Sequence, residues 1–426
     1  MFQTFGDATV KRNRKLVDMV AKPGRKRRPI HLEIDVPLLL VVVLLLIFGL
    51  LIVYSASWDY SFRHYGSATY IFSRQLIFMG LGLIGAGALT FLDYHIWSWK
   101  RLPVYAMGVT VLMLLGVLFV NEVRNGAVRT LWGGSIQPSE LAKLMTVIYL
   151  SVWLYAKREQ LSNVSFGLIP LSAILGILGG LIFVQPDLSA VITIFFLGGV
   201  LFFLAGADLR QIGVLILVAL LFGWFIVVLN PTGSERVANY LKGVRDYTQA
   251  SYHVQRSLEA FVNGGWFGVG IGNGRTKLTG LPVPPTDSVF AVVGEETGIF
   301  GSVILVGLYS ALLWRGLTIA RRAPDGLGAL MAAGLSIWLA WEAFINMAVM
   351  LNLLPFAGNA LPFISSGGSN LVMSLAAIGI LLNISRSSEH SKEQVWSPYR
   401  ALIDLRWRDR RRRVSRSRRS AGAPEA

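Results

Sequence analysis

The chain of 426 residues has no cysteine, only five histidines and only 15% charged residues. Without cysteine it cannot contain disulfides, thiolate metal sites, iron–sulfur clusters or a cysteine nucleophile. Soluble domains usually carry about 25% charged residues, whereas 54% of this chain is hydrophobic. The composition therefore predicts a membrane protein and argues against a soluble globular one.

The net charge of +16 is concentrated at the two ends of the sequence. Residues 1–31 contain nine Lys and Arg against two acidic residues, and residues 385–426 contain twelve against five, so these tails carry +14 of the +16. Basic segments beside membrane spans stay on the cytoplasmic side and contact anionic lipids. We interpret both segments as basic cytoplasmic tails and expect no nucleic-acid partner.

Apolar windows long enough to cross a bilayer, about 20 residues each, recur along the chain between the tails. We count ten of them, at residues 36–54, 75–92, 102–120, 140–156, 167–185, 188–206, 211–230, 288–314, 328–351 and 367–384. An even number of spans places both termini on the same side of the membrane. The sequence thus predicts an all-α polytopic membrane domain over residues 32–384, with about ten transmembrane helices.

The longest connection, residues 231–287, joins the seventh and eighth spans and is extracytoplasmic in this topology. Residues 236–258 space their apolar side chains at helical intervals, which predicts an amphipathic helix at the membrane surface. Residues 264–274 are rich in glycine, which lets the backbone turn tightly or approach a ligand. Several Lys and Arg also lie on this side, either as harmless surface charge of a long loop or as part of an anion site.

Acidic and basic residues at the outer ends of the spans are the candidate functional groups. Glu140 and Lys143 lie one turn apart at the start of the fourth span and can pair. Thr286 is expected to cap the eighth span, which places Asp287 in its first turn and Glu295 and Glu296 about two turns deeper. Ionisable groups inside a membrane cost a few kcal/mol each, so we expect the three carboxylates to serve function. Asp187, after Gln185 and Pro186, is expected to cap the next helix.

The stretch before the tenth span is broken by proline and glycine at residues 361–369 and contains Ser365. Broken helix ends are tolerated at membrane depth where they line protein or a wet cavity. We therefore predict a cavity at the outer face, walled by the fourth, eighth and tenth spans.

Five sequence blocks together resemble a known family. They are YSAS at 54–57, GAVRTLWGGSIQPSELAKL at 126–144, QPDLSA at 185–190, the long block at 252–298 and LPFISSGGSNL at 361–371. In this order and spacing, the chain resembles the SEDS family (shape, elongation, division and sporulation), whose members include RodA, FtsW and SpoVE. It departs from the family pattern where the usual Glu and His before Thr286 are absent, which weakens any mechanism that needs them.

The resemblance implies a peptidoglycan glycosyltransferase that polymerises lipid II at the outer face of the bacterial cytoplasmic membrane. It also implies a class B penicillin-binding protein as partner, together with other division or elongation proteins, without separating the two roles. Asp287 matches the essential Asp of the family, and the acceptor hydroxyl needs such a carboxylate as a base. The candidate substrate-binding residues are Arg129, Glu140, Lys143, Gln255, Arg256, Lys277, Glu295, Glu296 and Ser365.

The leaving undecaprenyl pyrophosphate requires stabilisation by Lys and Arg or by a divalent cation such as Mg²⁺ or Mn²⁺. No residues are assigned as metal ligands, and no other cofactor is expected. The alternatives are a lipid II flippase and a scaffold of the division or elongation machinery. A flippase needs a polar path to the cytoplasmic side, whereas the unusual residues cluster at the outer ends of the spans, which favours the enzyme.

Overall fold

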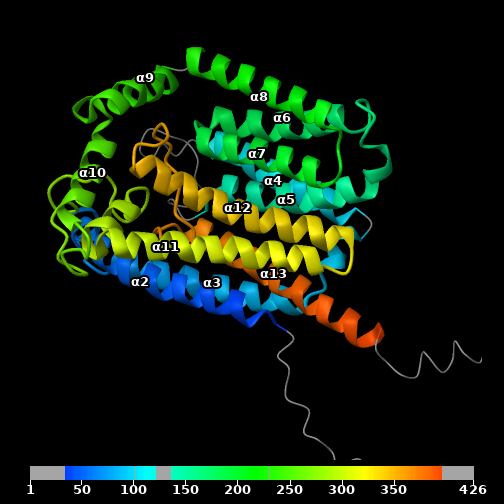
Figure 1. The fold of residues 1–426 in the computed structure, drawn as a ribbon, viewed down its shortest axis with the longest axis horizontal. Helices are drawn as coiled ribbons and strands as arrows, with labels where there is room; N and C mark the ends of the chain where they lie inside the picture. The colour runs from blue at the N-terminus through cyan, green and yellow to red at the C-terminus, as the bar shows by residue number, and fades with distance from the viewer. Residues whose placement is uncertain (1–33, 100, 121–135, 230, 396–426) are drawn as a thin grey trace, which may run out of the picture. The chain divides into compact units, whose positions relative to one another are not determined.

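The computed structural model describes residues 34–99, 101–120, 136–229 and 231–395. Ten long helices follow one another in this part of the chain (Figure 1). They are α2 (Val36–Tyr65), α3 (Tyr70–Phe91), α4 (Leu102–Val120), α5 (Pro138–Lys157), α6 (Leu168–Val184), α7 (Leu188–Leu204), α8 (Leu209–Leu229), α11 (Val289–Arg322), α12 (Gly326–Met350) and α13 (Gly368–Val395). The predicted tail at 1–31 and residues 396–426 of the other tail lie outside the described residues.

Each predicted span overlaps one of these helices. By length and composition, six are able to cross a membrane: α2, α3, α11, α12, residues Leu102–Phe119 of α4 and Gly368–Ser388 of α13. Shorter apolar helices occur at Leu168–Val184, Leu188–Leu204 and Leu209–Leu221. The prediction of an all-helical polytopic membrane protein is confirmed.

The connection after α8 is also mostly helical, with α9 (Pro231–Arg245), the 3₁₀ turn η3 (Tyr247–Gln249) and α10 (Tyr252–Gly264). The predicted amphipathic helix over 236–258 is therefore two helices. Asp246 separates them, because its side chain accepts a hydrogen bond from Thr248 N at 3.0 Å.

Aspartates cap the N-termini of several helices. Asp35 accepts from Leu38 N at 2.9 Å, and Asp325 accepts from Gly328 N at 2.7 Å, so each satisfies a backbone donor that has no partner within its helix. Asp187 caps α7 in the same way, accepting from Ala190 N at 3.3 Å, as predicted. Gly66, at φ 70°, ends α2 in the left-handed conformation that glycine adopts without strain.

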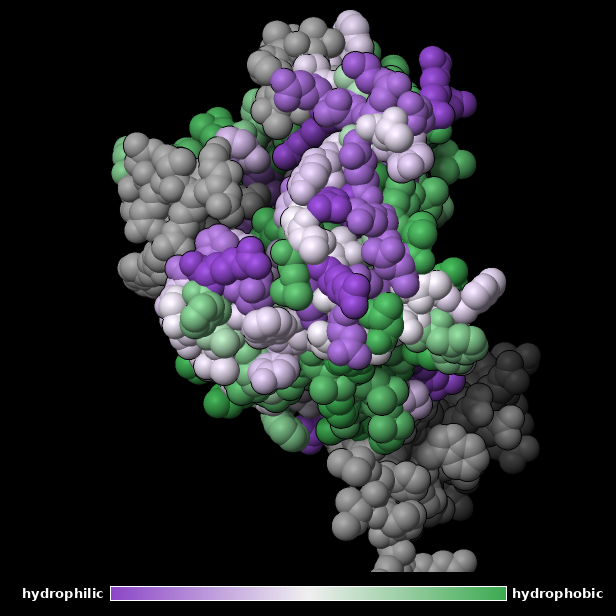
Figure 2. All heavy atoms as spheres, turned by 90° about the vertical axis from the view of Figure 1, so that its left-hand side faces the viewer, coloured by the Kyte–Doolittle hydropathy of each residue, from purple (hydrophilic) through white to green (hydrophobic). Residues whose placement is uncertain are grey.

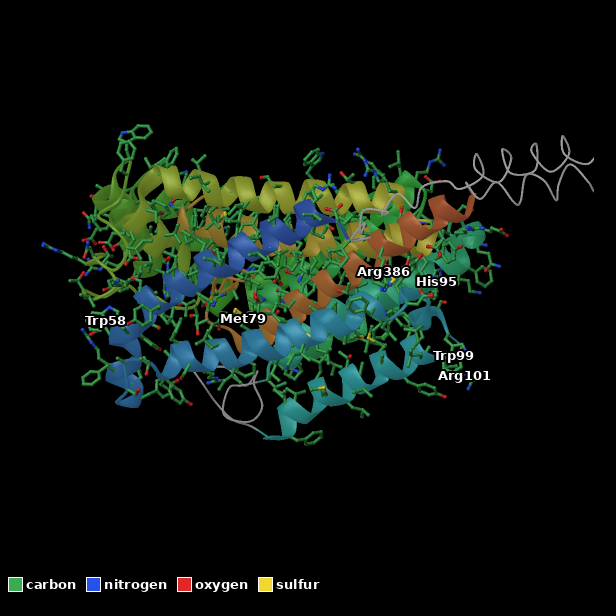
Figure 3. The ribbon with its side chains drawn as sticks, turned by 90° about the horizontal axis from the view of Figure 1, so that it is seen from below. Trp58, Met79, His95, Trp99, Arg101 and Arg386 are labelled. Atoms are coloured by element: carbon green, nitrogen blue, oxygen red, sulfur yellow. The ribbon has the colours of Figure 1, made fainter. Side chains whose placement is uncertain are left out.

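The helices pack through small residues. α3 runs along α13, and a Cβ at Gly379 would lie 2.5 Å from the backbone oxygen of Ala86, so only glycine fits there. Such close approach is a common basis of helix association in membranes. Figure 3 shows α3 between α2 and α4, with Trp58 at one end and Trp99 and Arg101 at the other; α3 packs on α2 and on α13.

We call the end at which α2 finishes and α3, α5, α7 and α11 begin the site end, and the opposite end the tail end. Figure 2 faces the side on which α9 and α10 lie in Figure 1. Hydrophilic side chains gather over its upper and central part, whereas hydrophobic ones lie along its lower edge.

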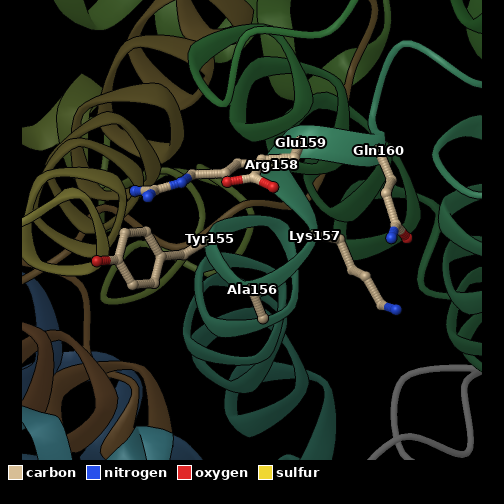
Figure 4. A pocket seen from close by; sticks show the side chains of 6 residues that line it. All are labelled: Tyr155, Ala156, Lys157, Arg158, Glu159 and Gln160. Atoms are coloured by element: carbon tan, nitrogen blue, oxygen red, sulfur yellow. The ribbon is translucent and has the colours of Figure 1, made fainter.

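Polar contacts join the helices at the tail end. Arg315 of α11 pairs with Asp35 at 2.5 Å. A hollow lies where α5 meets the 3₁₀ turn η2 (Arg158–Gln160); Figure 4 shows its lining, in which the Arg158 guanidinium lies 5.2 Å from the centre of the Tyr155 ring. This hollow is at the opposite end of α5 from Glu140, so we do not assign it to the candidate site.

His95, in the 3₁₀ turn η1 (Tyr94–Ser98), joins two aspartates at the tail end. Its ring nitrogens lie 2.7 Å from Asp93 and 3.0 Å from Asp325. Burial lowers the pKa of His95, but hydrogen bonding and charge interaction with Asp93, followed by the interactions with Asp325, raise it by more, so the net pKa is above its ordinary value. The ring thus ties η1 to the start of α12, and the raised pKa means that these contacts favour its protonated form.

We expect this tie to weaken as the pH rises. Because the pKa of His95 is raised on folding, its contribution to the free energy of unfolding is complete below about pH 6.5 and is lost as the pH passes the raised pKa. Thermal unfolding of the purified protein and of His95→Gln would measure it. The difference should be small, about 0.5 kcal/mol for a partly exposed pair, and should disappear at high pH; a constant difference across the range would contradict the prediction.

Candidate functional site

Asp287 lies at the site end, on a segment whose backbone is held by other parts of the chain. Ser365 Oγ donates to Thr286 O at 2.7 Å, and Ser366 N donates to Pro285 O at 2.7 Å. From α12, Asn346 Nδ2 donates to Asp287 O at 2.9 Å. The sequence predicted Asp287 in the first turn of the eighth span, but α11 begins later, at Val289. Asp287 thus belongs to a rigid turn before the helix.

The carboxylate of Asp287 is half-buried and lies against the segment between α12 and α13. A Cβ placed on Gly358 would be 3.0 Å from Asp287 Oδ2, so the carboxylate lies close to the Gly358 backbone. Tyr60, near the end of α2, lies close enough to Asp287 for its hydroxyl to interact electrostatically with this carboxylate. The site around Asp287 is therefore assembled from α2, the segment before α11 and the segment before α13.

Glu296 and Lys277 form a buried ion pair beside this segment. Lys277 Nζ lies 2.6 Å from Glu296 Oε1, and the side chains are 2% and 0% exposed. Ser55 of α2 completes the cluster, because its hydroxyl donates to Glu296 Oε1 at 2.6 Å and accepts from Lys277 Nζ at 2.6 Å. The cluster ties the large loop, α11 and α2 together.

Glu295 binds the same loop through backbone donors. Its carboxylate accepts from Arg275 N at 2.8 Å, Thr276 N at 3.0 Å and the Thr276 hydroxyl at 2.9 Å. Glu295 and Glu296 thus hold residues 275–277 of the large loop against α11, and we call them the clamp. This structural role explains why two carboxylates occur in this part of the span. Contact of Glu295, Glu296 or Lys277 with substrate stays a prediction.

The glycine-rich stretch, residues 264–274, packs closely against the backbone of α11. α11 is interrupted at Gly298, with φ 69° and ψ −169°, and Val269 N and Gly270 N donate to the carbonyls of Glu295 and Glu296 at 3.0 Å each. A Cβ on Gly268 would lie 2.2 Å from Glu296 O, so glycine permits this contact.

Lys143 and Glu140 pair as their spacing predicts, at 2.9 Å. Lys143 also pairs with Glu342 of α12, and Asn370 of α13 donates to Glu140 Oε2 at 3.0 Å and to Glu342 Oε2 at 3.3 Å. Glu140, Lys143 and Glu342 are at most 6% exposed. The group joins the fourth, ninth and tenth spans, so a substrate contact of Glu140 or Lys143 needs an opening between them and stays a prediction.

The remaining candidate site residues are Gln255, Arg256, Ser365 and Arg129. Gln255 Nε2 donates to Thr248 O at 2.6 Å and Ala250 O at 2.8 Å, which holds the turn before α10. Arg256 pairs with Glu259 at 2.5 Å and also donates to Thr279 O. Ser365 supports the backbone before Asp287, and Arg129 lies outside the described residues.

Glu342 of α12, which pairs with Lys143, was not among the predicted site residues, although its charge within a span is a sequence signal. Two uncharged residues of these clusters, Ser55 and Asn370, were not predicted either. Both lie inside the family-like blocks, which is the one sequence signal that marks them. A serine or an asparagine in a span carries no charge, so its residue type alone does not distinguish a functional residue from one that only packs between helices. Their role becomes visible only when α2 and α13 meet Lys277 and Glu140.

Residues 36–390 match the FtsW/RodA/SpoVE family model, described as cell cycle protein. The chain belongs to this family. It is 37% identical over 362 residues to the probable peptidoglycan glycosyltransferase FtsW of Trichlorobacter lovleyi, covering 84% of this chain and 95% of that protein. It is 35% identical over 360 residues to stage V sporulation protein E of Bacillus subtilis, covering 84% and 98%.

Solved structures of the family share the fold. One chain of a peptidoglycan synthase complex, described for its coordination of polymerization and crosslinking, superposes with a TM-score of 0.68 at 29% identity, covering 84% of this chain and 99% of that one. The rod shape determining protein RodA of Thermus thermophilus superposes with a TM-score of 0.61 at 27% identity, with the same coverage. The SEDS resemblance predicted from the sequence blocks is confirmed.

Proposed function

We propose that this chain is a peptidoglycan glycosyltransferase that polymerises lipid II, with Asp287 as its catalytic base. Membership of the family and its similarity to probable peptidoglycan glycosyltransferases support the reaction class. The observation that carries the residue assignment is the position of Asp287, half-buried at the site end on backbone held by Asn346, Ser365 and Ser366. A base fixed in this way can meet an acceptor hydroxyl at hydrogen-bond distance.

In the reaction, the 4-hydroxyl of an acceptor N-acetylglucosamine attacks the anomeric carbon of a donor N-acetylmuramic acid. Asp287 takes the hydroxyl proton as the new glycosidic bond forms. The bond between the anomeric carbon and the pyrophosphate breaks, and undecaprenyl pyrophosphate leaves with the electron pair. Fixing Asp287 before substrate arrives avoids the entropy loss of ordering it during the reaction.

The negative charge on the leaving pyrophosphate requires cations near the site. Lys143 and Lys277 are already paired with buried carboxylates. We therefore favour for this role two arginines of the large loop that are not enclosed by buried carboxylates: the exposed Arg275, and Arg256, whose partner Glu259 is itself 47% exposed. In the ranges that the structure describes, no group of three His, Asp or Glu is arranged for a metal, so Mg²⁺ or Mn²⁺ stays a prediction that metal addition to the assay tests.

The proposal includes a partner and an orientation. The FtsW/RodA-like chain that this protein resembles comes from a complex that couples polymerization to crosslinking. This supports a class B penicillin-binding protein as partner, with other division or elongation proteins around it. Lysines and arginines in the tails and near the tail end support a cytoplasmic location of both termini in the bacterial inner membrane. In the proposed orientation, Asp287 is at the outer face.

The test is polymerisation of labelled lipid II by the full-length chain and its class B partner in vesicles, with products separated by glycan length. We expect long glycans. Movement of lipid II across the vesicle membrane without polymer would replace this proposal by a flippase. A lack of both activities in a correctly folded complex would leave the scaffold.

Gly358→Ala should slow polymerisation without unfolding the chain. The added methyl group would lie 3.0 Å from Asp287 Oδ2, so the carboxylate has to move by a few tenths of an ångström. Since small misplacements of reacting groups are costly, we expect a rate loss of about tenfold. Gly307→Ala on the exposed face of α11 meets no atom within 4 Å and is the control. Equal rates for both variants would show that Gly358 does not position Asp287.

A further inference from the structure

Between α10 and α11 the large loop exposes two large aromatic side chains. Trp266 is 71% exposed and Phe267 is 84% exposed. No residue from 264 to 274 is charged. Exposed apolar groups of this size, close together, mark an interaction surface more often than ordinary protein surface.

The aromatic pair is held rigidly against α11. Ile299 N donates to Gly265 O at 2.9 Å, and Phe300 N donates to Trp266 O at 3.1 Å. These bonds replace helix bonds that the break at Gly298 leaves open. The backbone of Trp266 therefore lies level with Phe300.

The level of Trp266 and Phe300 along α11 lies near one boundary of the membrane. Phe300 and Val303 are each 62% exposed on the outward, apolar face of α11, which is a candidate span. The eighth span was predicted at 288–314, but α11 is broken at Gly298 and continues beyond 314 to Arg322 at the tail end. At 1.5 Å per residue the helix rises about 33 Å from Phe300 to Arg322, compared with about 30 Å for the hydrocarbon core.

We propose that Trp266 and Phe267 insert into the leaflet at the site end and bind lipid acyl chains as an interfacial anchor. Three observations support lipid as the occupant: Phe300 and Val303 expose an apolar face of α11 at the level of Trp266, the stretch 264–274 lacks charge, and the level matches the interface where Trp is enriched. The anchor would fix the loop that Glu295 and Glu296 clamp. It is independent of the reaction that the protein catalyses.

The absence of cysteine allows a direct test with single labels. Phe267→Cys carries a nitroxide on the full-length protein in phosphatidylcholine–phosphatidylglycerol vesicles, and its relaxation by oxygen and by a water-soluble nickel complex is measured. The controls are Phe300→Cys, expected in lipid, and Lys242→Cys, which replaces an exposed, charged side chain of α9 expected in water. We expect the oxygen-to-nickel ratio at residue 267 to be several-fold higher than at 242 and close to that at 300.

Two results would overturn the anchor. A ratio at 267 equal to that at 242 would place the loop in water. Protection from both oxygen and nickel would show that protein, from a second copy or a refolded loop, covers the pair. Trp266→Cys provides a second label if the first variant does not fold.

Discussion

Asp287→Asn abolishes glycan polymerisation, with an expected rate loss of about 10²–10⁴-fold, the usual range for removing a general base. The amide has nearly the shape of the carboxylate but does not accept the acceptor hydroxyl's proton. Asn346 bonds the backbone oxygen of residue 287, so the segment should keep its position in the variant. The measurement is the rate of glycan formation by wild type and variant with the same class B partner.

Asp246→Asn is the matched control in the same loop. Asp246 is a partly exposed cap of η3, and Asn caps nearly as well as Asp. We expect it to polymerise normally. A fully active Asp287→Asn would remove Asp287 from the chemistry, whereas loss in both variants would indicate that any amide in this loop disturbs folding.

The helices were predictable because the membrane imposes a length and an apolar composition on each span. The ends were less predictable, since they depend on capping and on the folded environment. The amphipathic periodicity over 236–258 gave no sign that Asp246 would divide it, because an aspartate on a helix surface and an aspartate that caps a turn look alike in sequence. α11 began later than expected because the 282–288 turn is held by tertiary contacts from Asn346 and Ser365.

The candidate site was predictable only for neighbours in sequence. Glu140 and Lys143 are one turn apart, so their pairing follows from helix geometry. Their other partners, Glu342 and Asn370, come from helices that approach only after packing, and no spacing encodes that. The same holds for Ser55 and Lys277, which are separated by 222 residues. Placing Glu295 and Glu296 as clamps therefore required the structure.

The buried cluster around Lys143 leads to the second large prediction. Lys143→Met would leave Glu140 and Glu342 buried, with Asn370 donating to both but no cation between them. Removing one member of a buried ion pair costs about 3–5 kcal/mol, because the remaining charge stays without compensation. We expect a markedly lower Tm in detergent than for wild type, and poor recovery of the variant from the membrane. Lys277→Met, which leaves one buried carboxylate without its cation, provides a comparison with a second buried lysine.

A triple variant separates folding from substrate binding at this cluster. Lys143→Met with Glu140→Gln and Glu342→Gln removes all three charges at nearly constant volume, and such neutral replacements are often tolerated or stabilising. We expect it to recover most of the lost stability. If it also polymerises lipid II, the cluster acts by holding α5, α12 and α13 together; if it is stable but inactive, Glu140 or Lys143 contacts substrate. A stable Lys143→Met single variant would contradict the prediction, because the two carboxylates would then have found water or protons in place of the lysine.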